Sequence, residues 1–286
     1  MPNRYADPWK GFAKRWDEYY TAPGRPTRDE VRIFLNYIKK SGKLAKGKKS
    51  KIKVLVLGAT PELRDMLARI KADVSLIDVS KYMIREMTKL RKTRSKEHRF
   101  TGNWLKMPFS GGYFDIVVGD LAQGNIPKNK KDIFLAEISR VLKKEGYFIH
   151  RIFHMPEHQR YVNPERIFGR YSRYKYSKQL HMGMFMDLLY NTYNKKTNIT
   201  DTAIMKGWIS KYMYSPGKFR HPDRQISKLL ERAYVMWQPF KKKWCTFPEK
   251  DIAKMMERHF IIMDNSIRTG SHRMAETFRI WSLKKR

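Results

Sequence analysis

"KVLVLGATPELRDML", residues 53–67, decides the fold, because it reads as a buried strand, a very short turn and a helix. Residues 53–57 are apolar without polar alternation, which is typical of a strand buried on both faces of a parallel sheet. Gly58 suits the turn because glycine adopts backbone angles that other residues avoid. Thr60 is the predicted N-cap of the following helix, and Pro61 fits its first turn.

A second strand is predicted over residues 72–78, "ADVSLID", with Asp78 at its carboxyl end and an amphipathic helix behind it. Asp78 follows Gly58 by about 20 residues, the spacing at which a nucleotide-binding βαβ unit places a carboxylate on the ribose hydroxyls. The pattern therefore predicts a nucleoside site at the turn. In an alternative interpretation, Asp78 ends its strand and caps the helix that begins at Ser80.

The glycine count indicates which nucleoside this site would bind. Dinucleotide sites favour G-x-G-x-x-G, because a pyrophosphate lies against bare backbone at the helix start. Here Gly58 stands alone, and Glu62 is a poor neighbour for phosphates. S-adenosylmethionine (SAM), which carries ribose without phosphates, fits better than a nicotinamide dinucleotide, although a nicotinamide enzyme with a degraded fingerprint stays an alternative.

Four segments in order resemble the motifs of the class I SAM-dependent methyltransferases. They are "VLVLGATPE", "VSLIDVS", "FTGNWLKMPFSGGYFDIVVGDLAQGNIP" and "FLAEISRVLKKEGYFIHRIF". The resemblance covers residues 50–153 and, more loosely, a final hairpin over residues 258–283. It implies an α/β fold: a Rossmann-like, seven-stranded, mostly parallel sheet with an antiparallel last strand, an N-terminal helical lid and a helical insertion before the last two strands.

The same resemblance implies a division of the chain and a set of site residues. The expected parts are a lid segment (1–45), a SAM-binding core (46–155), a basic acceptor-side insertion (156–257) and a closing hairpin (258–286). The expected cofactor is SAM. The residues implied to contact it are Gly58, Ala59, Thr60 and Glu62 near the methionine part, Asp78 at the ribose, Val79, Asn103 and Trp104 at the adenine, and Asp120, Leu121 and Gln123 near the methyl group.

The N-terminal segment predicts a short aromatic helix, a turn at "APGRP" and a second helix, in which Thr27 and Glu30 form a capping box. Similar "W…Y…RP" segments close over the cofactor in some methyltransferases of this family. By that resemblance, the lid residues are Trp16, Tyr19, Tyr20 and Arg25. Packing of the same aromatic side chains in the core is the alternative.

The composition restricts the compartment and the partners. The 286 residues include 61 Lys and Arg against 27 Asp and Glu, a net charge of +34. Such an excess is typical of proteins that bind polyanions, although a basic proteome gives the same bias. The single cysteine, Cys245, excludes internal disulfides and a cysteine-rich zinc site, so no metal is expected. With no apolar run of membrane-spanning length and a polar beginning, the sequence predicts a cytoplasmic protein without a membrane partner.

The insertion contains a stretch, residues 160–181, in which arginines and aromatic residues alternate. Proteins often bind single-stranded RNA with basic side chains that contact the phosphates and aromatic rings that stack on the bases. The predicted nucleic-acid or acceptor contacts are Arg166, Arg170 and Arg173 on one helix face, with Tyr171 and Tyr174. Alternatively, the rings pack inward and the arginines are merely solvated.

Methyl transfer from a sulfonium is an in-line displacement, so the enzyme acts mainly by positioning the acceptor nucleophile and excluding water. If a general base is needed, Asp120, His154 and also His150 are candidates, although a lone histidine is more often structural. The fourth motif, "DLAQGN", lacks the Asn/Asp-Pro-Pro-aromatic run of many enzymes that methylate exocyclic base amines. It also lacks the cysteine needed to methylate carbon 5 of cytosine.

Three functions remain open at this stage. The first and favoured one is a methyltransferase that acts on RNA, which predicts RNA binding that weakens steeply with salt. The second is a small-molecule methyltransferase, favoured by the lid and by the lack of a separate RNA-binding domain. The third is a non-catalytic RNA-binding or ribosome-assembly protein that keeps the fold and binds no SAM. The oligomeric state does not follow from the sequence.

Overall fold

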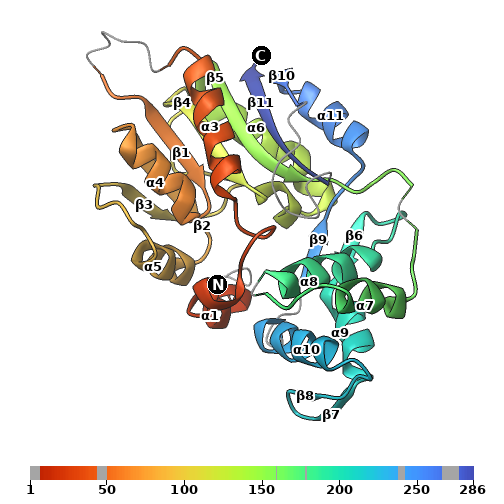
Figure 1. Ribbon diagram of the computed structural model, residues 1–286. Coiled ribbons are helices and arrows are strands. Elements are labelled where there is room, and N and C mark those ends of the chain that lie inside the picture. The colour runs from red at the N-terminus through yellow and green to blue at the C-terminus, as the bar shows by residue number, and fades with distance from the viewer. Residues whose placement is uncertain (1–6, 44–49, 159, 178, 238–241, 266–276) are drawn as a thin grey trace.

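The computed structural model describes residues 7–43, 50–158, 160–177, 179–237, 242–265 and 277–286. A seven-stranded sheet in the order β10-β11-β5-β4-β1-β2-β3 forms its centre (Figure 1). Strand β11 runs antiparallel to both of its neighbours, β10 and β5, and the remaining neighbouring pairs are parallel. The strands are β1 Lys53–Leu57, β2 Asp73–Asp78, β3 His98–Thr101, β4 Phe114–Asp120, β5 Leu142–Phe153, β10 Phe260–Asp264 and β11 Phe278–Lys285. The predicted mostly parallel sheet with an antiparallel last strand is confirmed.

Helices cover both faces of the sheet (Figure 1). The helices α3 (Arg28–Lys40), α4 (Pro61–Arg69) and α5 (Lys81–Lys89) bury their apolar sides on one face, and α6 (Lys131–Val141) and α11 (Glu249–Glu257) cover the other. Strands buried from both sides need continuous apolar sequence, which explains the lack of alternation in β1. All parallel strands therefore point their carboxyl ends to one edge of the molecule.

The quoted stretch forms the elements that its pattern predicts. Strand β1 ends at Leu57, and α4 begins at Pro61 with Thr60 at the N-cap position. The Thr60 side chain, however, accepts no hydrogen bond from the helix backbone. Thr60 is one of the residues that line a cavity. At α5, in contrast, the Ser80 side chain accepts a hydrogen bond from the Met83 N–H at 3.2 Å.

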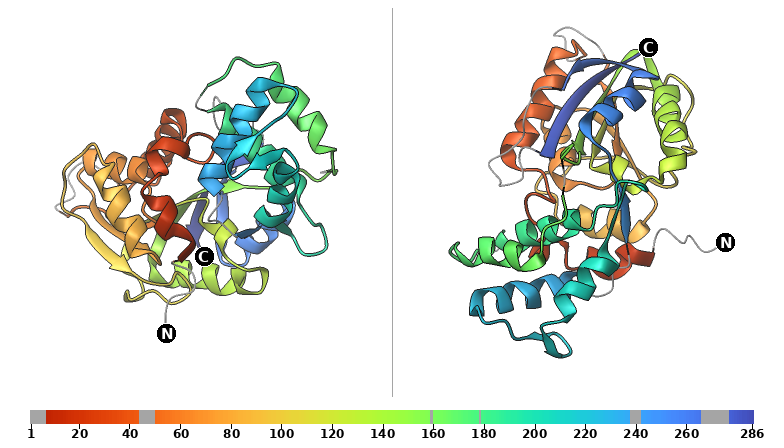
Figure 2. Two further views of the ribbon diagram at one scale, coloured as in Figure 1. Left: turned by 90° about the horizontal axis from the view of Figure 1, so that it is seen from below. Right: turned by 90° about the vertical axis from the view of Figure 1, so that its right-hand side faces the viewer.

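The N-terminal segment forms α1 (Asp7–Ala13), α2 (Trp16–Tyr19) and then α3. The predicted capping box is present: the Glu30 N–H donates to the Thr27 hydroxyl at 3.2 Å, and the Thr27 N–H donates to Glu30 Oε2 at 2.6 Å. The first two helices lie between the sheet and the insertion (Figure 2). Phe12 belongs to the apolar core of the insertion, so this segment packs on the insertion as well as on the sheet.

The insertion lies beyond the carboxyl ends of the parallel strands (Figure 2). It contains the helices α7 (Pro164–Ser172), α8 (Leu180–Asn191), α9 (Thr202–Ser210) and α10 (Arg224–Trp237). Two small antiparallel sheets, β6 (Ile199–Asp201) with β9 (Lys243–Cys245) and β7 (Met213–Ser215) with β8 (Lys218–Phe219), were not predicted. Two 3₁₀ turns, η1 (Ala122–Asn125) and η2 (Lys128–Lys130), follow β4.

Candidate active site

The turn after β1 exposes backbone toward the end of β2. Gly58 has φ +91°, a conformation that favours glycine, and its N–H donates to the Ile77 carbonyl at 2.9 Å. A Cβ placed on Gly58 would lie 3.8 Å from both Asp78 Oδ2 and Trp104 Cζ2. The turn, the carboxylate and the indole therefore face the same small space.

Asp78 ends β2 as a buried carboxylate with two different oxygens. Oδ1 accepts a hydrogen bond from the Ser80 N–H at 2.8 Å, while Oδ2 lies toward Gly58. Both interpretations of Asp78 are thus compatible, because one oxygen supports the start of α5 and the other faces the turn. Burial raises the pKa of the Asp78 carboxyl to about 6. Val79, the next residue, is half-buried.

The loop after β3 contributes the other side of this space. The Trp104 indole N–H donates to the Ile77 carbonyl at 2.8 Å, which holds the half-buried ring over the ends of β1 and β2. Asn103 is exposed, and its Oδ1 accepts from the Leu105 N–H at 2.9 Å. Asn103 therefore stabilises its own loop, and Trp104 is the residue of this pair that faces Gly58.

The lid segment is tied to α4 by an ion pair. Arg25 Nε donates to Glu62 Oε1 at 2.8 Å, and Arg25 Nη1 donates to Asp17 at 2.8 Å. Glu62 thus shares its charge with an arginine of the lid rather than facing the site as a free carboxylate. Ala59, between the turn and Thr60, is buried in the core beside the sheet.

Asp120 ends β4 in a buried ionic network that the sequence did not reveal. Arg151 Nε donates to Asp120 at 2.6 Å, and Arg151 Nη1 donates to Glu30 at 2.9 Å. The same guanidinium donates to the carbonyls of Pro23 and Gly24. Burial raises the pKa of the Asp120 carboxyl to about 6, although the Arg151 charge beside it acts in the opposite direction. Arg151 therefore connects β4 and β5 to the lid.

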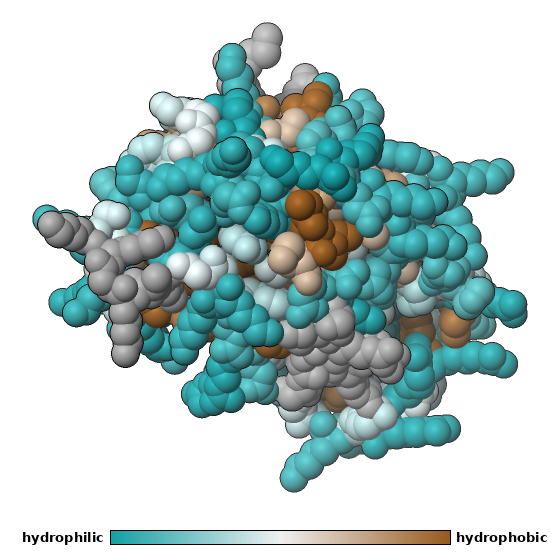
Figure 3. Space-filling view, turned by 90° about the horizontal axis from the view of Figure 1, so that it is seen from above, coloured by the Kyte–Doolittle hydropathy of each residue, from teal (hydrophilic) through white to brown (hydrophobic). Residues whose placement is uncertain are grey.

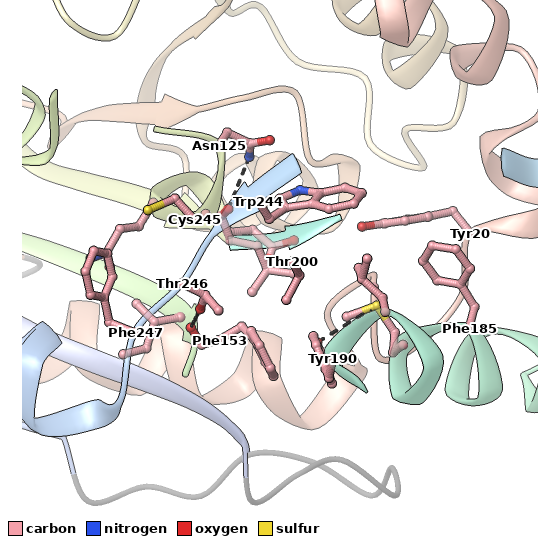
Figure 4. A pocket seen from close by; sticks show the side chains of 18 of the residues that line it. Tyr20, Asn125, Phe153, Phe185, Tyr190, Thr200, Trp244, Cys245, Thr246 and Phe247 are labelled. Carbon is pink, nitrogen blue, oxygen red and sulfur yellow. Dashed lines mark hydrogen bonds between the residues drawn. The ribbon is translucent and has the colours of Figure 1, made fainter. Parts of the chain in front are cut away.

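A cavity of about 130 Å³ opens between the end of β4, the lid and the insertion (Figure 4). Its wall is mainly apolar and includes eight aromatic side chains, and the rings of Phe153 and Tyr190 stack at 3.9 Å between centroids. Gln123 adds a buried amide whose nitrogen and oxygen have no hydrogen-bond partner in the described part of the chain. The lining residues include Trp9, Trp16, Tyr20, Thr60, Asp120, Leu121, Gln123, Asn125, Phe153, Phe185, Leu189, Tyr190 and Trp244.

The predicted lid residues divide into three groups. Trp16 and Tyr20 line the cavity with their rings 4.0 Å apart, and Figure 4 shows Tyr20 beside it. Tyr19 lies elsewhere: its ring is under the Arg232 guanidinium at 4.7 Å, and its carbonyl contacts His181 Nε2 at 2.7 Å. Arg25 binds Glu62, as described above. The same aromatic side chains also pack against the insertion core, so the alternative of core packing applies to them too.

The two histidines lie outside the cavity wall. The His150 ring stacks on Phe148 at 4.9 Å, and burial lowers the pKa of His150 to about 3. His154 Nε2 lies 3.7 Å from Glu249 Oε2 on α11. Neither is among the residues that line the cavity, so His154 stays a prediction that its surroundings do not support.

The predicted nucleic-acid contacts are only partly available at the surface. Tyr171 is 1% exposed, and its hydroxyl donates to Asp187 at 2.9 Å. The prediction that this ring stacks on bases is therefore wrong for this structure, because the apolar side of α7 turns it into the core. Arg166, Arg170, Arg173 and Tyr174 are exposed, and Arg170 lies 3.7 Å from Asp187.

Comparisons with known proteins agree with this fold. Residues 57–150 match the family model described as "Methyltransferase domain". No curated protein sequence matches the chain. Among solved structures, a protein from Rhodobacter sphaeroides that is provisionally described as a zinc-dependent alcohol dehydrogenase has a TM-score of 0.61 at 12% identity, covering 100% of this chain and 99% of its own.

Two further structures are described as methyltransferases. A SAM-dependent methyltransferase from Methanosarcina mazei has a TM-score of 0.50 at 16% identity, covering 88% of this chain and 96% of its own. The magnesium protoporphyrin IX methyltransferase of Synechocystis PCC 6803, with bound S-adenosylhomocysteine (SAH), has a TM-score of 0.51 at 14% identity, covering 98% and 97%. At such identities these likenesses concern the fold.

The matched domain and the sheet order identify the class I, Rossmann-like methyltransferase fold. Residues 57–150 are thus a methyltransferase domain, and SAM is the cofactor that such a domain implies. The residues at the strand ends fit such a group, since a glycine turn with positive φ faces an oxygen of a buried carboxylate. In the described ranges, no helix is both long and apolar enough to cross a bilayer.

Proposed function

We propose that this enzyme transfers the methyl group of SAM to a small organic molecule with a flat, apolar part. The observation that supports this most is the cavity, which combines an aromatic wall with the single unpartnered amide of Gln123. Pockets for small molecules have this composition, in which apolar walls bind the body and a few polar groups set its orientation. The described residues that line the cavity include no arginine to bind a phosphate, and Arg151 nearby is paired with Asp120 and Glu30.

We assign the cofactor to the strand ends beside this cavity. Oδ2 of Asp78 would accept hydrogen bonds from the ribose hydroxyls, Val79 and Trp104 would border the adenine, and the Gly58 turn would allow close approach to the backbone. Bound there, SAM supplies a methyl group on a positively charged sulfur. The chain's own task is to hold the acceptor in line and to keep water out.

The role of Asp120 differs from that of a free base. Its carboxylate accepts a hydrogen bond from the Arg151 guanidinium at 2.6 Å. The same guanidinium donates to Glu30 on α3, so Arg151 links Asp120 to the lid segment. We therefore propose that Asp120 positions the lid over the cavity. A role as proton acceptor stays a prediction for both Asp120 and His154.

The test compares acceptor classes directly. Transfer from methyl-labelled SAM is measured into small-molecule fractions and into RNA, for the wild type and for Leu189→Trp, which enlarges a side chain of the cavity wall. We expect label in a small molecule, a loss of at least tenfold in the variant, and SAM binding close to wild type. Ile204→Trp, at an exposed position of α9, is the control and should keep the activity. Labelled RNA with unchanged transfer by Leu189→Trp would contradict the proposal.

RNA is the second candidate acceptor, because one surface of the insertion combines rings with cations. Tyr161, Tyr174 and Tyr176 are exposed, and so are Arg166 and Arg173 of the same stretch of the sequence. Replacing Arg166 and Arg173 by Gln should then reduce methylation of RNA and leave SAM binding unchanged. The RNA partner and the cytoplasmic location stay predictions.

A further inference from the structure

A lysine ammonium occupies a box between the cofactor side and the cavity. Lys242 Nζ lies 3.8 Å from the centre of the Trp9 ring and 5.3 Å from that of Trp244, and it donates a hydrogen bond to Asn125 Oδ1. Trp9, Trp244 and Asn125 all line the cavity. Lys242 also interacts electrostatically with Asp78. The ammonium therefore lies at the proposed acceptor cavity and within electrostatic range of the predicted ribose carboxylate.

The position of the Lys242 backbone is set independently of its side chain. Its N–H donates to the Thr202 hydroxyl at 2.9 Å, and its carbonyl accepts from the Thr202 N–H at 3.1 Å and hydroxyl at 2.9 Å. The side chain can therefore leave the box by rotation about its own bonds, while β9 and the start of α9 stay in place.

We propose that Trp9 and Trp244 form a cation box for the sulfonium of SAM, and that the Lys242 ammonium occupies this box until SAM displaces it. The inference rests on the assignment of SAM as cofactor, with its ribose at Asp78. A sulfonium between Asp78 and the cavity would then point its methyl group at the acceptor. Aromatic faces attract cations, and they do so most strongly when the cation has lost its water.

The charges around the box suit exchange of one cation for another. Asp78 is the charged group that acts on Lys242, whereas Trp9 on α1, Asn125 on η1, Thr202 on α9 and Trp244 on β9 are uncharged. Burial lowers the pKa of Lys242 to about 7, while Asp78 acts in the opposite direction. The compact ammonium is thus poorly compensated for its lost water, so Lys242 loses its proton easily and occupies the box weakly, and the sulfonium, whose charge is permanent, should replace it.

When SAM displaces Lys242 from the box, the lysine should gain a proton. At pH 8.5 the boxed amine is mostly neutral, whereas a lysine in water keeps its usual pKa of about 10.4 and is charged. SAM binding should therefore take up close to one proton from the buffer at this pH. Since Asp78 is ionised at pH 8.5 in both states, it contributes little to this change.

The test is calorimetric titration with SAM and with SAH, the neutral thioether, at pH 8.5 in two buffers of different ionisation enthalpy. The variants are Lys242→Met and Trp244→Leu, and the matched control is Lys243→Met, an exposed neighbour. The wild type and Lys243→Met should take up about one proton, and Lys242→Met should lose this uptake and bind both nucleosides more tightly. Trp244→Leu should lower the ratio of SAM to SAH affinity roughly threefold or more.

The outcomes separate this inference from the proposed function. Equal proton uptake by the wild type and Lys242→Met, proton release instead of uptake, or an unchanged SAM-to-SAH ratio in Trp244→Leu would each overturn the cation box. Wild-type protein that binds neither nucleoside would overturn the cofactor assignment itself. Because no acceptor is present, a wrong acceptor class leaves these measurements unaffected.

Discussion

Two buried carboxylates, at the ends of the strands on either side of β1, have different roles because their surroundings differ. Asp78 and Asp120 both follow apolar strands, and burial raises the pKa of each to about 6. Asp120 is bound to Arg151, which makes it part of the structure that holds the lid. Asp78 has Lys242 nearby and directs one oxygen toward the Gly58 turn. We therefore expect Asp78, rather than Asp120, to accept hydrogen bonds from the ribose hydroxyls of SAM.

Replacing Asp78 by Asn should lower SAM affinity by at least tenfold, because an ionised acceptor to the ribose hydroxyls is lost. Asp73→Asn, at the other end of β2, is the control and should bind like the wild type. In the wild type, affinity should fall as the pH drops below about 6, since protonation removes the acceptor. Calorimetric titration measures both effects, and unchanged binding by Asp78→Asn would refute the assignment.

At the scale of single residues, the sequence predicted candidate functional residues of the β1–α4 and β2–α5 units. It did not predict which residues their side chains contact. Gly58, Asp78 and the capping box at Thr27 follow from local pattern. Arg25 binding Glu62 joins residues 37 positions apart, and Arg151 binding Glu30 joins residues 121 apart. No local pattern specifies such contacts, because they depend on how the elements pack.

At the scale of elements, the insertion is where sequence patterns were least informative. Helix α8 was not predicted, although 11 of its residues are buried. An amphipathic period is the usual evidence for a helix, and α8 has little, because the lid, α7 and α10 surround it. Helix α7 was recognised, but its inward face carries Tyr171 into the core. The small β6–β9 sheet pairs segments about 40 residues apart, which no short pattern predicts.

The element that attaches the lid is α3, and Arg151 is its buried anchor. Arg151→Gln should lower the free energy of unfolding by about 3 to 5 kcal/mol, because Glu30 and Asp120 lose a buried countercharge. Urea denaturation measures this loss. The comparison variant is Arg32→Gln, which removes an exposed ion pair with Asp29 and should change stability by less than about 1 kcal/mol. Equal stability of the two variants would contradict the role of Arg151.

At the scale of the whole molecule, the insertion and the lid enclose an apolar cavity within a strongly basic protein. The surface on the side away from the insertion is mostly hydrophilic, with small hydrophobic areas (Figure 3). The chain has a net charge of +34, whereas the cavity wall is mainly apolar. Charge can attract polyanions without defining the acceptor.

The affinities for RNA and for SAM should depend differently on salt concentration. Binding of labelled RNA, followed by fluorescence anisotropy, should weaken by about a thousandfold between 50 and 200 mM salt if several phosphates are contacted. SAM, held in a buried site, should bind with nearly the same affinity over this range. RNA binding that resists salt would indicate a specific RNA site and favour the second candidate acceptor.

Local patterns sufficed for the βαβ units, the cofactor class and the order of most strands, because apolar runs, turn residues and caps act within a few positions. The composition likewise established the basic character of the chain. Folding alone brought Arg151 to Glu30, Lys242 to Trp9 and Asp78, and α8 to the cavity wall. These contacts join segments distant in the chain, so they arise from the burial of whole faces and the pairing of buried charges, which no short stretch of residues encodes.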